Sequence, residues 1–91
     1  MFRSFRSRAL ASLWNKGDAS KIRPDLVARV KLRLAALAAS RRPEDMNVPG
    51  FDCHKLRGKP VHYSVHVNGP WCITFGWHGE DAVLVDLENY H

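Results

Sequence analysis

The chain has 91 residues, which is enough for one domain with a modest core and leaves no room for a second. Its apolar content of 45% and aromatic content of 10% exclude a disordered chain, because such chains are poor in the residues that build a core. The formal net charge is +5 and the isoelectric point is near 9.7. We therefore expect a polyanionic or acidic partner, although a solvated basic surface gives the same charge.

The pattern of apolar residues indicates neither membrane insertion nor export. No apolar run approaches the ~20 residues of a membrane span. The arginines at the start of the chain are not followed by a continuous apolar stretch before Asn15, so a cleaved signal peptide is not indicated. We expect a single domain over residues 1–91 that is cytoplasmic and has no membrane partner.

The first segment predicts a short strand followed by a helix. Phe2 and Phe5 are apolar on either side of polar residues, as in an edge strand over residues 1–5. Ser7 is a suitable N-cap for the helix, and Gly17 is a suitable left-handed end. Between them, apolar residues recur at helical spacing, namely Ala9, Leu10, Leu13 and Trp14.

A longer helix is predicted from Pro24 to about Ser40. One stripe, which we expect to pack on the sheet, consists of Leu26, Val30, Leu34 and Leu37. A second stripe of mostly small residues consists of Ala28, Leu32, Ala35 and Ala39. The simpler interpretation is that the first helix lies on the second stripe, and the alternative is a docking groove for a partner. Arg29 and Arg33 lie one turn apart and predict a solvated face.

The second half of the chain predicts strands joined by hairpins. Pro43 begins a single helical turn, and a strand is expected over residues 51–56. Turns follow at Asn68-Gly69-Pro70 and at residues 78–81, where Asn-Gly is a strong hairpin signal. The fold class is therefore α+β, with a short N-terminal strand, two helices and a largely antiparallel four-strand sheet.

The period of two along the last strands predicts one core face and one polar face. Val83, Val85 and Leu87 continue the core register. The polar face, which is a candidate working surface, carries His62, Ser64, His66, Cys72, Thr74, Asp86, Glu88 and Tyr90. Zinc is disfavoured, because Cys53 and Cys72 do not form a short chelating motif with each other or with the histidines. We expect both thiols to be reduced, and no metal or other cofactor.

Two short segments contain groups suited to RNA chemistry. His54 is followed by a basic loop with Lys55, Arg57 and Lys59, which supplies cations for phosphates. The chain ends on Tyr90-His91, a phenol and an imidazole suited to proton transfer or base stacking. Considered alone, a histidine such as His54 or His91 more often has a structural role than a catalytic one. No carboxylate cluster of a metal nuclease is present, so any RNA cleavage is expected to be metal-free.

The chain resembles the HigB toxins of the RelE/ParE superfamily over essentially its whole length. The motifs that carry the resemblance are His54-Lys55-Leu56-Arg57-Gly58, Tyr63-Ser64-Val65, Gly69-Pro70-Trp71-Cys72-Ile73-Thr74-Phe75, Gly79-Glu80-Asp81-Ala82 and Asn89-Tyr90-His91. Upstream, Phe2-Arg3-Ser4-Phe5, the Leu-Trp-Asn-Lys-Gly stretch at residues 13–17 and the long basic helix before Pro43 also match.

The resemblance implies a ribosome-dependent endoribonuclease, an mRNA interferase that inhibits translation by cutting mRNA in the ribosomal A site. A base would deprotonate the ribose 2′-hydroxyl, cations would hold the developing charge, and an acid would protonate the leaving oxygen. By the same resemblance, the functional positions are His54, Arg57, Tyr90 and His91. The implied partner is a helix-turn-helix antitoxin resembling HigA, which would also connect the toxin to operator DNA.

The chain departs from the family pattern at three positions. Cys72 and Gly76 stand where many relatives have a phosphate-facing arginine, and Asn89 replaces a common aspartate. The nearest replacement cations in sequence are Lys55 and Lys59, so attenuated activity is one interpretation.

Two rival functions remain for a chain of this resemblance. One is a gyrase poison resembling ParE, and the other is a degenerate toxin that serves as a binding module for its antitoxin and operator complex. For the antitoxin contact, the stripe of Ala28, Leu32, Ala35 and Ala39 is our candidate.

Overall fold

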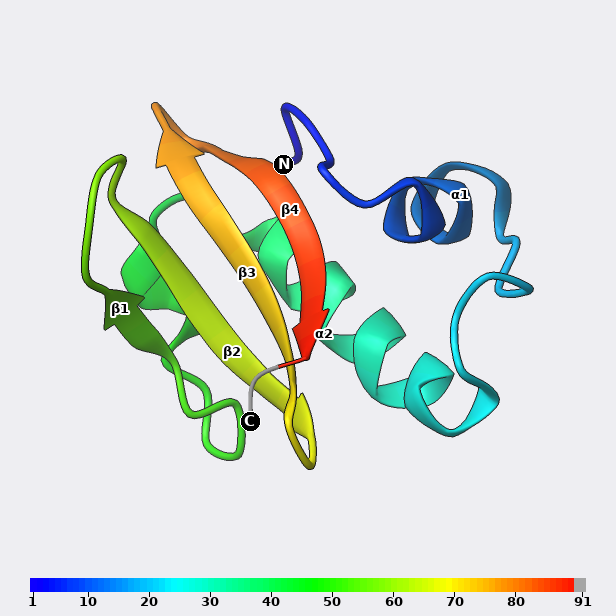
Figure 1. The fold of residues 1–91 in the computed structure, drawn as a ribbon. Helices are drawn as coiled ribbons and strands as arrows, with labels where there is room; N and C mark the ends of the chain where they lie inside the picture. Colours follow the sequence, from blue (N-terminus) through cyan, green and yellow to red (C-terminus); the bar gives the residue numbers. More distant parts are fainter. Residues whose placement is uncertain (90–91) are drawn as a thin grey trace.

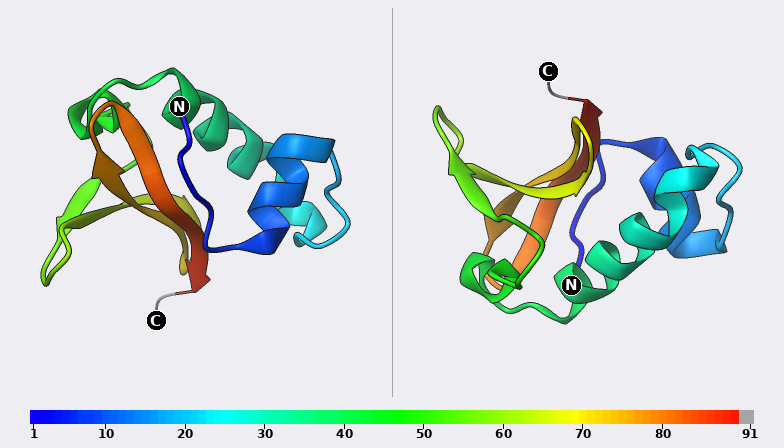
Figure 2. Two further views of the ribbon diagram at one scale, coloured as in Figure 1. Left: turned by 90° about the horizontal axis from the view of Figure 1, so that it is seen from above. Right: turned by 90° about the horizontal axis from the view of Figure 1, so that it is seen from below.

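The computed structural model describes residues 1–89, so Tyr90 and His91 lie outside the described residues. A four-stranded antiparallel meander in the order β1-β2-β3-β4 has α2 across one face, while α1 lies beyond β4 (Figures 1 and 2). The α+β fold class is therefore confirmed. The elements are α1 (Arg8–Lys16), η1 (Pro24–Leu26), α2 (Val27–Ala39), η2 (Pro43–Met46), β1 (His54–Leu56), β2 (His62–Asn68), β3 (Trp71–His78) and β4 (Asp81–Asn89).

The expected N-terminal strand is not formed. Instead, Phe2 and Phe5 make isolated parallel bridges to Ala82 and Val85 of β4. Between these bridges the Ser4 hydroxyl accepts the backbone N–H of Leu84, at 2.9 Å. Leu84 has a φ of 52° and interrupts the regular edge of β4, so the N-terminal segment follows that edge without a continuous ladder.

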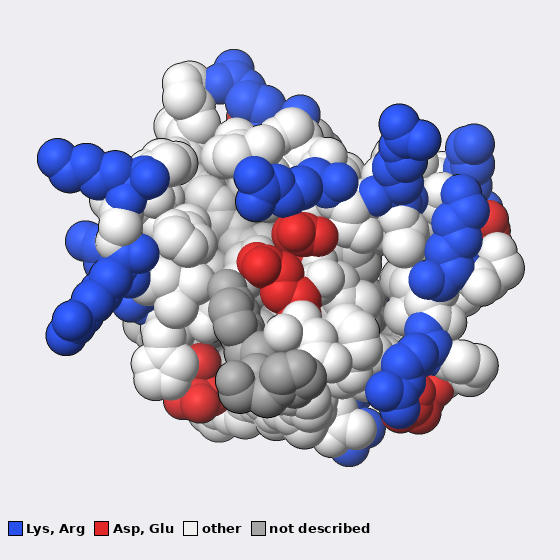
Figure 3. Space-filling view, viewed as in Figure 1, with Lys and Arg blue, Asp and Glu red and all other residues white. Residues whose placement is uncertain are grey.

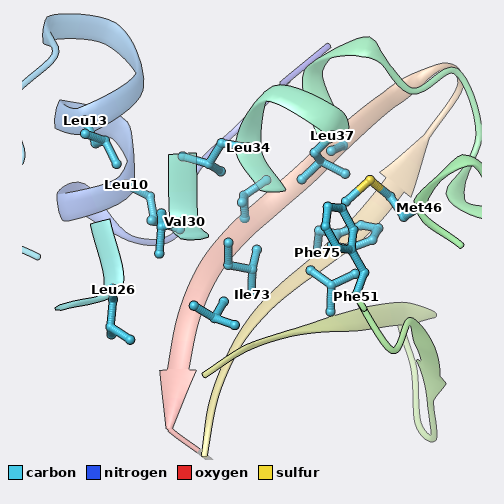
Figure 4. Close-up of a cluster of buried hydrophobic side chains, with 14 of the residues drawn as sticks. Leu10, Leu13, Leu26, Val30, Leu34, Leu37, Met46, Phe51, Ile73 and Phe75 are labelled. Carbon is cyan, nitrogen blue, oxygen red and sulfur yellow. The ribbon is translucent and has the colours of Figure 1, made fainter. Parts of the chain in front are cut away.

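The predicted boundaries of α1 are confirmed. The Ser7 hydroxyl accepts the backbone N–H of Leu10 at 3.2 Å, and Gly17 ends the helix with a φ of 68°. Both caps satisfy backbone groups that a helix end leaves without partners. Leu10 and Leu13 are buried against α2 and the sheet (Figure 4).

The core stripe of the second helix is also confirmed, since Leu26, Val30, Leu34 and Leu37 are all buried (Figure 4). A 3-10 turn at Pro24 starts this helical segment, and α2 ends at Ala39. The second stripe is exposed at all four positions, and Leu32 is 60% exposed. The first helix therefore does not lie on it, and the simpler interpretation of this stripe is wrong.

The prediction of a solvated Arg33 is wrong. Its side chain is only 7% exposed, and its Nε donates a 2.6 Å hydrogen bond to the carbonyl of His66. The guanidinium lies 4.6 Å from the centre of the Phe51 ring, a cation–π contact. Burial, followed by the charge of Arg29, lowers the pKa of Arg33. The register of β2 and β3 shifts between His66 and Asn68, and Arg33 supplies a donor at this irregular point.

The first strand is shorter than expected, because residues 51–53 turn rather than extend. Asp52 has a φ of 48°, in the left-handed region, and Phe51 is buried in the core beside Met46 and Phe75 (Figure 4). The carbonyl of Phe51 accepts the backbone N–H of His66 at 2.6 Å. The turn thus attaches to β2 and places His54 at the start of β1.

A β-bulge in β4 changes which side chains share a face. Thr74 pairs with Asp86, but Gly76 pairs with Val83, so β4 contains one extra residue at Leu84. Because of this residue, Val83 lies on the outer face with Gly76, whereas Val85 is buried in the core. The expectation that Val83 continues the core register is therefore wrong, and the reason is the bulge.

Candidate active site

The outer face of the sheet, opposite α2, brings polar side chains of all four strands into rows. Directly paired residues place their side chains on the same face. One row consists of His54, Ser64, Thr74 and Asp86. A second row consists of His66, Cys72 and Glu88. The predicted polar register is confirmed for the members within residues 1–89, although Ser64 and Thr74 are buried rather than exposed. Tyr90, the remaining member, lies outside the described residues.

His54 lies at the open β1 end of the first row. Its side chain is 62% exposed, and Nε2 is 2.9 Å from a carboxylate oxygen of Asp52. The left-handed turn at Asp52 brings this carboxylate next to the ring. The contact with this carboxylate favours one orientation of the imidazole. His54 is thus accessible to a large ligand and has a polar partner.

The predicted cations do not all share the face of His54. Arg57 and Lys59 are exposed in the loop after β1 and form no ion pair with the described residues. Lys55 is paired with Tyr63, one position out of phase with His54, so it lies on the opposite face. There it borders a depression of about 210 Å³ with Cys53. Figure 3 shows Lys and Arg side chains around the rim of the outer face and acidic side chains nearer its middle.

The positions that lack an arginine have distinct surroundings. Burial raises the pKa of the Cys72 thiol, and the carboxylates of Asp52 and Glu88 raise it further, so a neutral thiol stands in a negative environment. At Gly76, an added Cβ would approach Cγ2 of Val83 to 3.0 Å. A larger side chain at Gly76 therefore requires Val83 to move.

A cavity on this face joins residues of the predicted polar face to Arg6, which the sequence did not predict as a site residue. The cavity has a volume of about 280 Å³ and opens between the loop before β2 and the bulge of β4. Arg6 lines it together with Thr74, Glu88 and Trp77, and the Thr74 hydroxyl donates to the Glu88 carboxylate. Arg6 reaches this cavity because the N-terminal segment runs along β4. No local sequence signal indicates that pairing.

Residues 1–89 contain neither a metal-binding cluster of side chains nor a membrane-spanning helix. No group of three His, Cys, Asp or Glu side chains in this part of the chain is arranged to hold a metal ion. No described helix is both long and apolar enough to cross a membrane. The two cysteines are free thiols in partly buried positions.

Comparison with known proteins identifies the family. The profile of the HigB-like toxins, described as the RelE-like toxin of the type II toxin–antitoxin system HigB, matches residues 3–91. The chain belongs to this family. It is also 30% identical over 92 residues to Endoribonuclease HigB of Proteus vulgaris, with both chains covered completely.

The family assignment confirms the resemblance to the HigB toxins. A HigB-like toxin is one half of a type II toxin–antitoxin pair, so its partner is an antitoxin. Of the four functional positions that the resemblance implies, the structure describes His54 and Arg57, while Tyr90 and His91 lie outside the described residues. Asn89, the last described residue of β4, pairs with Trp71.

Proposed function

We propose that this HigB-like toxin is a ribosome-dependent endoribonuclease that cuts mRNA in the A site and so inhibits translation in the cytoplasm. The observation that carries the proposal is the full-length identity of 30% with a protein named Endoribonuclease HigB. Exposed His54, with Arg57 and Lys59 in the adjoining loop, supports it. An RNA-cleaving site needs a proton acceptor and cations near a phosphate.

The proposed chemistry uses side chains alone. One group among His54, Tyr90 and His91 removes the proton of the ribose 2′-hydroxyl, which attacks the neighbouring phosphate. Arg57 stabilises the charge that develops on the phosphate oxygens, and Lys59 binds a flanking phosphate. A second group of the three protonates the leaving 5′-oxygen. DNA lacks the attacking hydroxyl and is spared.

Cleavage of mRNA on programmed ribosomes tests this proposal. We expect His54→Ala to slow cleavage by on the order of 100-fold or more, because general acid–base groups contribute about that much, and Tyr90→Ala to abolish it. Arg8→Ala is the matched control, since Arg8 is exposed at the start of α1, away from the outer face. Naked RNA should be cut poorly.

Full cleavage by both site variants would refute the assignment of these residues. Gyrase-dependent DNA breaks with intact mRNA in expressing cells would instead favour a poison resembling ParE.

A catalytically attenuated toxin that acts as a binding module is the second candidate. The observation that favours it is the environment of Cys72, where a neutral thiol and two carboxylates replace an expected cation. Losing one preorganised cation costs on the order of 100-fold in rate or more. Antitoxin binding without growth arrest on induction would favour this candidate, and growth arrest without antitoxin would count against it.

The partner that we propose is a helix-turn-helix antitoxin resembling HigA, through which the toxin contacts operator DNA. Its proposed contact is the exposed stripe of α2, which consists of Ala28, Leu32, Ala35 and Ala39. Leu32→Glu should weaken the complex, because it places a charge in an apolar contact. Lys31→Glu is the control on the neighbouring surface. A complex that leaves the stripe exposed to solvent would contradict this assignment.

A further inference from the structure

The end of β4 pairs with β3 alone within residues 1–89. The N-terminal segment bridges β4 at Ala82 and Val85, and in the described part of the chain the residues after Val85 pair only with β3. The last described residue, Asn89, pairs with Trp71, the first residue of β3 (Figure 1). Tyr90-His91 follows Asn89 directly in the sequence. A contact that fixes Trp71 therefore also fixes the point at which Tyr90-His91 begins.

Trp71 has such a contact, and it comes from Arg23. Trp71 is half-buried and packs against the core. The guanidinium carbon of Arg23 is 5.9 Å from the centre of the Trp71 ring, which is within the range of a cation–π contact. Arg23 immediately precedes η1 and stands between the buried residues Ile22 and Leu26, so its backbone is anchored on both sides. The contact thus joins the loop before α2 to the start of β3.

Asp25 orients the guanidinium of Arg23. Nε of Arg23 donates to one carboxylate oxygen of Asp25 at 3.1 Å, and Nη2 donates to the other at 2.8 Å. Two such hydrogen bonds fix the plane of the guanidinium. The side chains of Arg23 and Asp25 are 59% and 51% exposed, and exposed ion pairs contribute little to stability. The effect of this pair is therefore local and acts on Trp71 rather than on the whole fold.

We propose that Arg23 and Asp25 are positioning residues of the toxin, which hold Trp71 and the end of β4 and so place Tyr90-His91 for catalysis. The inference rests on the proposed ribonuclease function, in which Tyr90-His91 takes part in proton transfer. A group that transfers a proton must lie within hydrogen-bond reach of it. A small displacement of such a group lowers the rate without changing the affinity for the substrate.

Cleavage of mRNA over a range of programmed-ribosome concentrations separates kcat from KM. Arg23→Met should lower kcat about two- to fivefold, which is the effect expected from an exposed cation–π contact, and should leave KM unchanged. Arg23→Lys keeps a cation near the ring and should restore part of the lost rate. Arg29→Met is the matched control, because it removes the same charge from an exposed position of α2 and should leave kcat unchanged.

A direct contact of Arg23 with ribosomal RNA would give a different pattern at Asp25. A nearby carboxylate weakens the attraction of a cation for phosphates, so Asp25→Asn would then lower KM. If Arg23 instead holds Trp71, Asp25→Asn should lower kcat, as Arg23→Met does, because the guanidinium loses its orientation. A raised KM in Arg23→Met together with a lowered KM in Asp25→Asn would overturn the inference.

A double-mutant cycle tests whether Arg23 acts through Trp71. Trp71→Leu removes the ring and keeps an apolar side chain at this position. In that background Arg23→Met should lower kcat no further, because the partner of the cation is already absent. An equal loss of kcat in both backgrounds would show that Arg23 acts elsewhere, and would overturn the inference.

Backbone amide NMR of the purified full chain gives a readout that does not depend on cleavage. Arg23→Met should shift the signals of Trp71 and of residues 87–89 and speed amide hydrogen exchange at residues 87–89, whereas Arg29→Met should not. The urea midpoint of Arg23→Met should equal that of the unaltered chain, because the contact is local. Unchanged signals at residues 87–89 would overturn the inference even if cleavage is slower.

The possible outcomes separate this inference from the ribonuclease proposal. If the unaltered chain cleaves no mRNA on ribosomes, the ribonuclease proposal fails and the catalytic role of Arg23 fails with it, while changed signals at residues 87–89 would still support its hold on β4. If the chain cleaves mRNA and these signals change but kcat does not, the ribonuclease stands and the positioning role is overturned. A lower kcat that depends on Trp71, together with changed signals at residues 87–89, would support both.

Discussion

Buried polar side chains have different roles on the inner and outer faces of the sheet. Within residues 1–89, the buried charged side chain on the α2 side is Arg33, and its donors reach the carbonyls of His66 and Arg29. On the outer face, Thr74 is buried, but it belongs to the row that begins at exposed His54, and it also lines an open cavity. The inner face therefore uses polar groups to complete the packing, while the outer face leaves them available to a ligand. Substitutions on the two faces should separate stability from activity.

The largest expected effect is on the inner face. Phe75 is fully buried and stacks with Tyr63 at 5.7 Å between ring centroids. Phe75→Ala should lower the free energy of unfolding by about 3–5 kcal/mol, because it leaves a cavity in the core. Urea denaturation of the purified chain measures this change. Leu32→Ala, on the exposed stripe of α2, should change it by no more than about 0.5 kcal/mol. Similar losses in both variants would contradict the described packing of α2.

A smaller loss of stability is expected at Arg33. Arg33→Met keeps an unbranched, largely apolar side chain but leaves the His66 carbonyl without this donor and removes the guanidinium from the Phe51 ring. The free energy of unfolding should fall by about 1–3 kcal/mol, and Arg29→Met, at an exposed position, is the matched control. An unchanged stability of Arg33→Met would show that the guanidinium is dispensable to the core.

The same contrast explains which parts of the fold are predictable from sequence. The caps of α1 and the core stripe of α2 depend on local spacing, so Ser7, Gly17 and the buried leucines are readable from the chain. The bulge at Leu84 lies against Ser4, which is 80 residues away in sequence and accepts the Leu84 N–H. No periodicity contains that information, and the face occupied by Val83 was therefore wrongly predicted.

In the candidate site, too, local motifs are readable from the sequence, whereas placements that depend on long-range pairing are not. His54 and Arg57 are identified by their motif, but the placement of Lys55 on the opposite face follows from the register with Tyr63. Arg6 enters the outer face only because the N-terminal segment lies along β4. The burial of Arg33 depends on the irregular end of β2, which a helical pattern does not indicate.

The smallest expected effect links the two faces through Asp52. Burial is the main cause that raises the pKa of the Cys53 and Cys72 thiols, and the Asp52 carboxylate is the next cause for both. Asp52→Asn removes that negative charge and keeps a residue type that tolerates a left-handed φ. The pKa of each thiol should therefore fall, and more thiolate should be present at pH 8.

Alkylation by iodoacetamide at pH 8, followed separately at each cysteine by peptide mass spectrometry, measures this effect. Both thiols should react modestly faster in Asp52→Asn, yet more slowly than an exposed thiol, because burial still raises their pKa. Asp81→Asn is the control, since its carboxylate lies near the N-terminal amine and contributes to neither thiol. A faster reaction at Cys53 alone would mean that Asp52 does not act on the outer face. The negative environment assigned to Cys72 would then rest on Glu88.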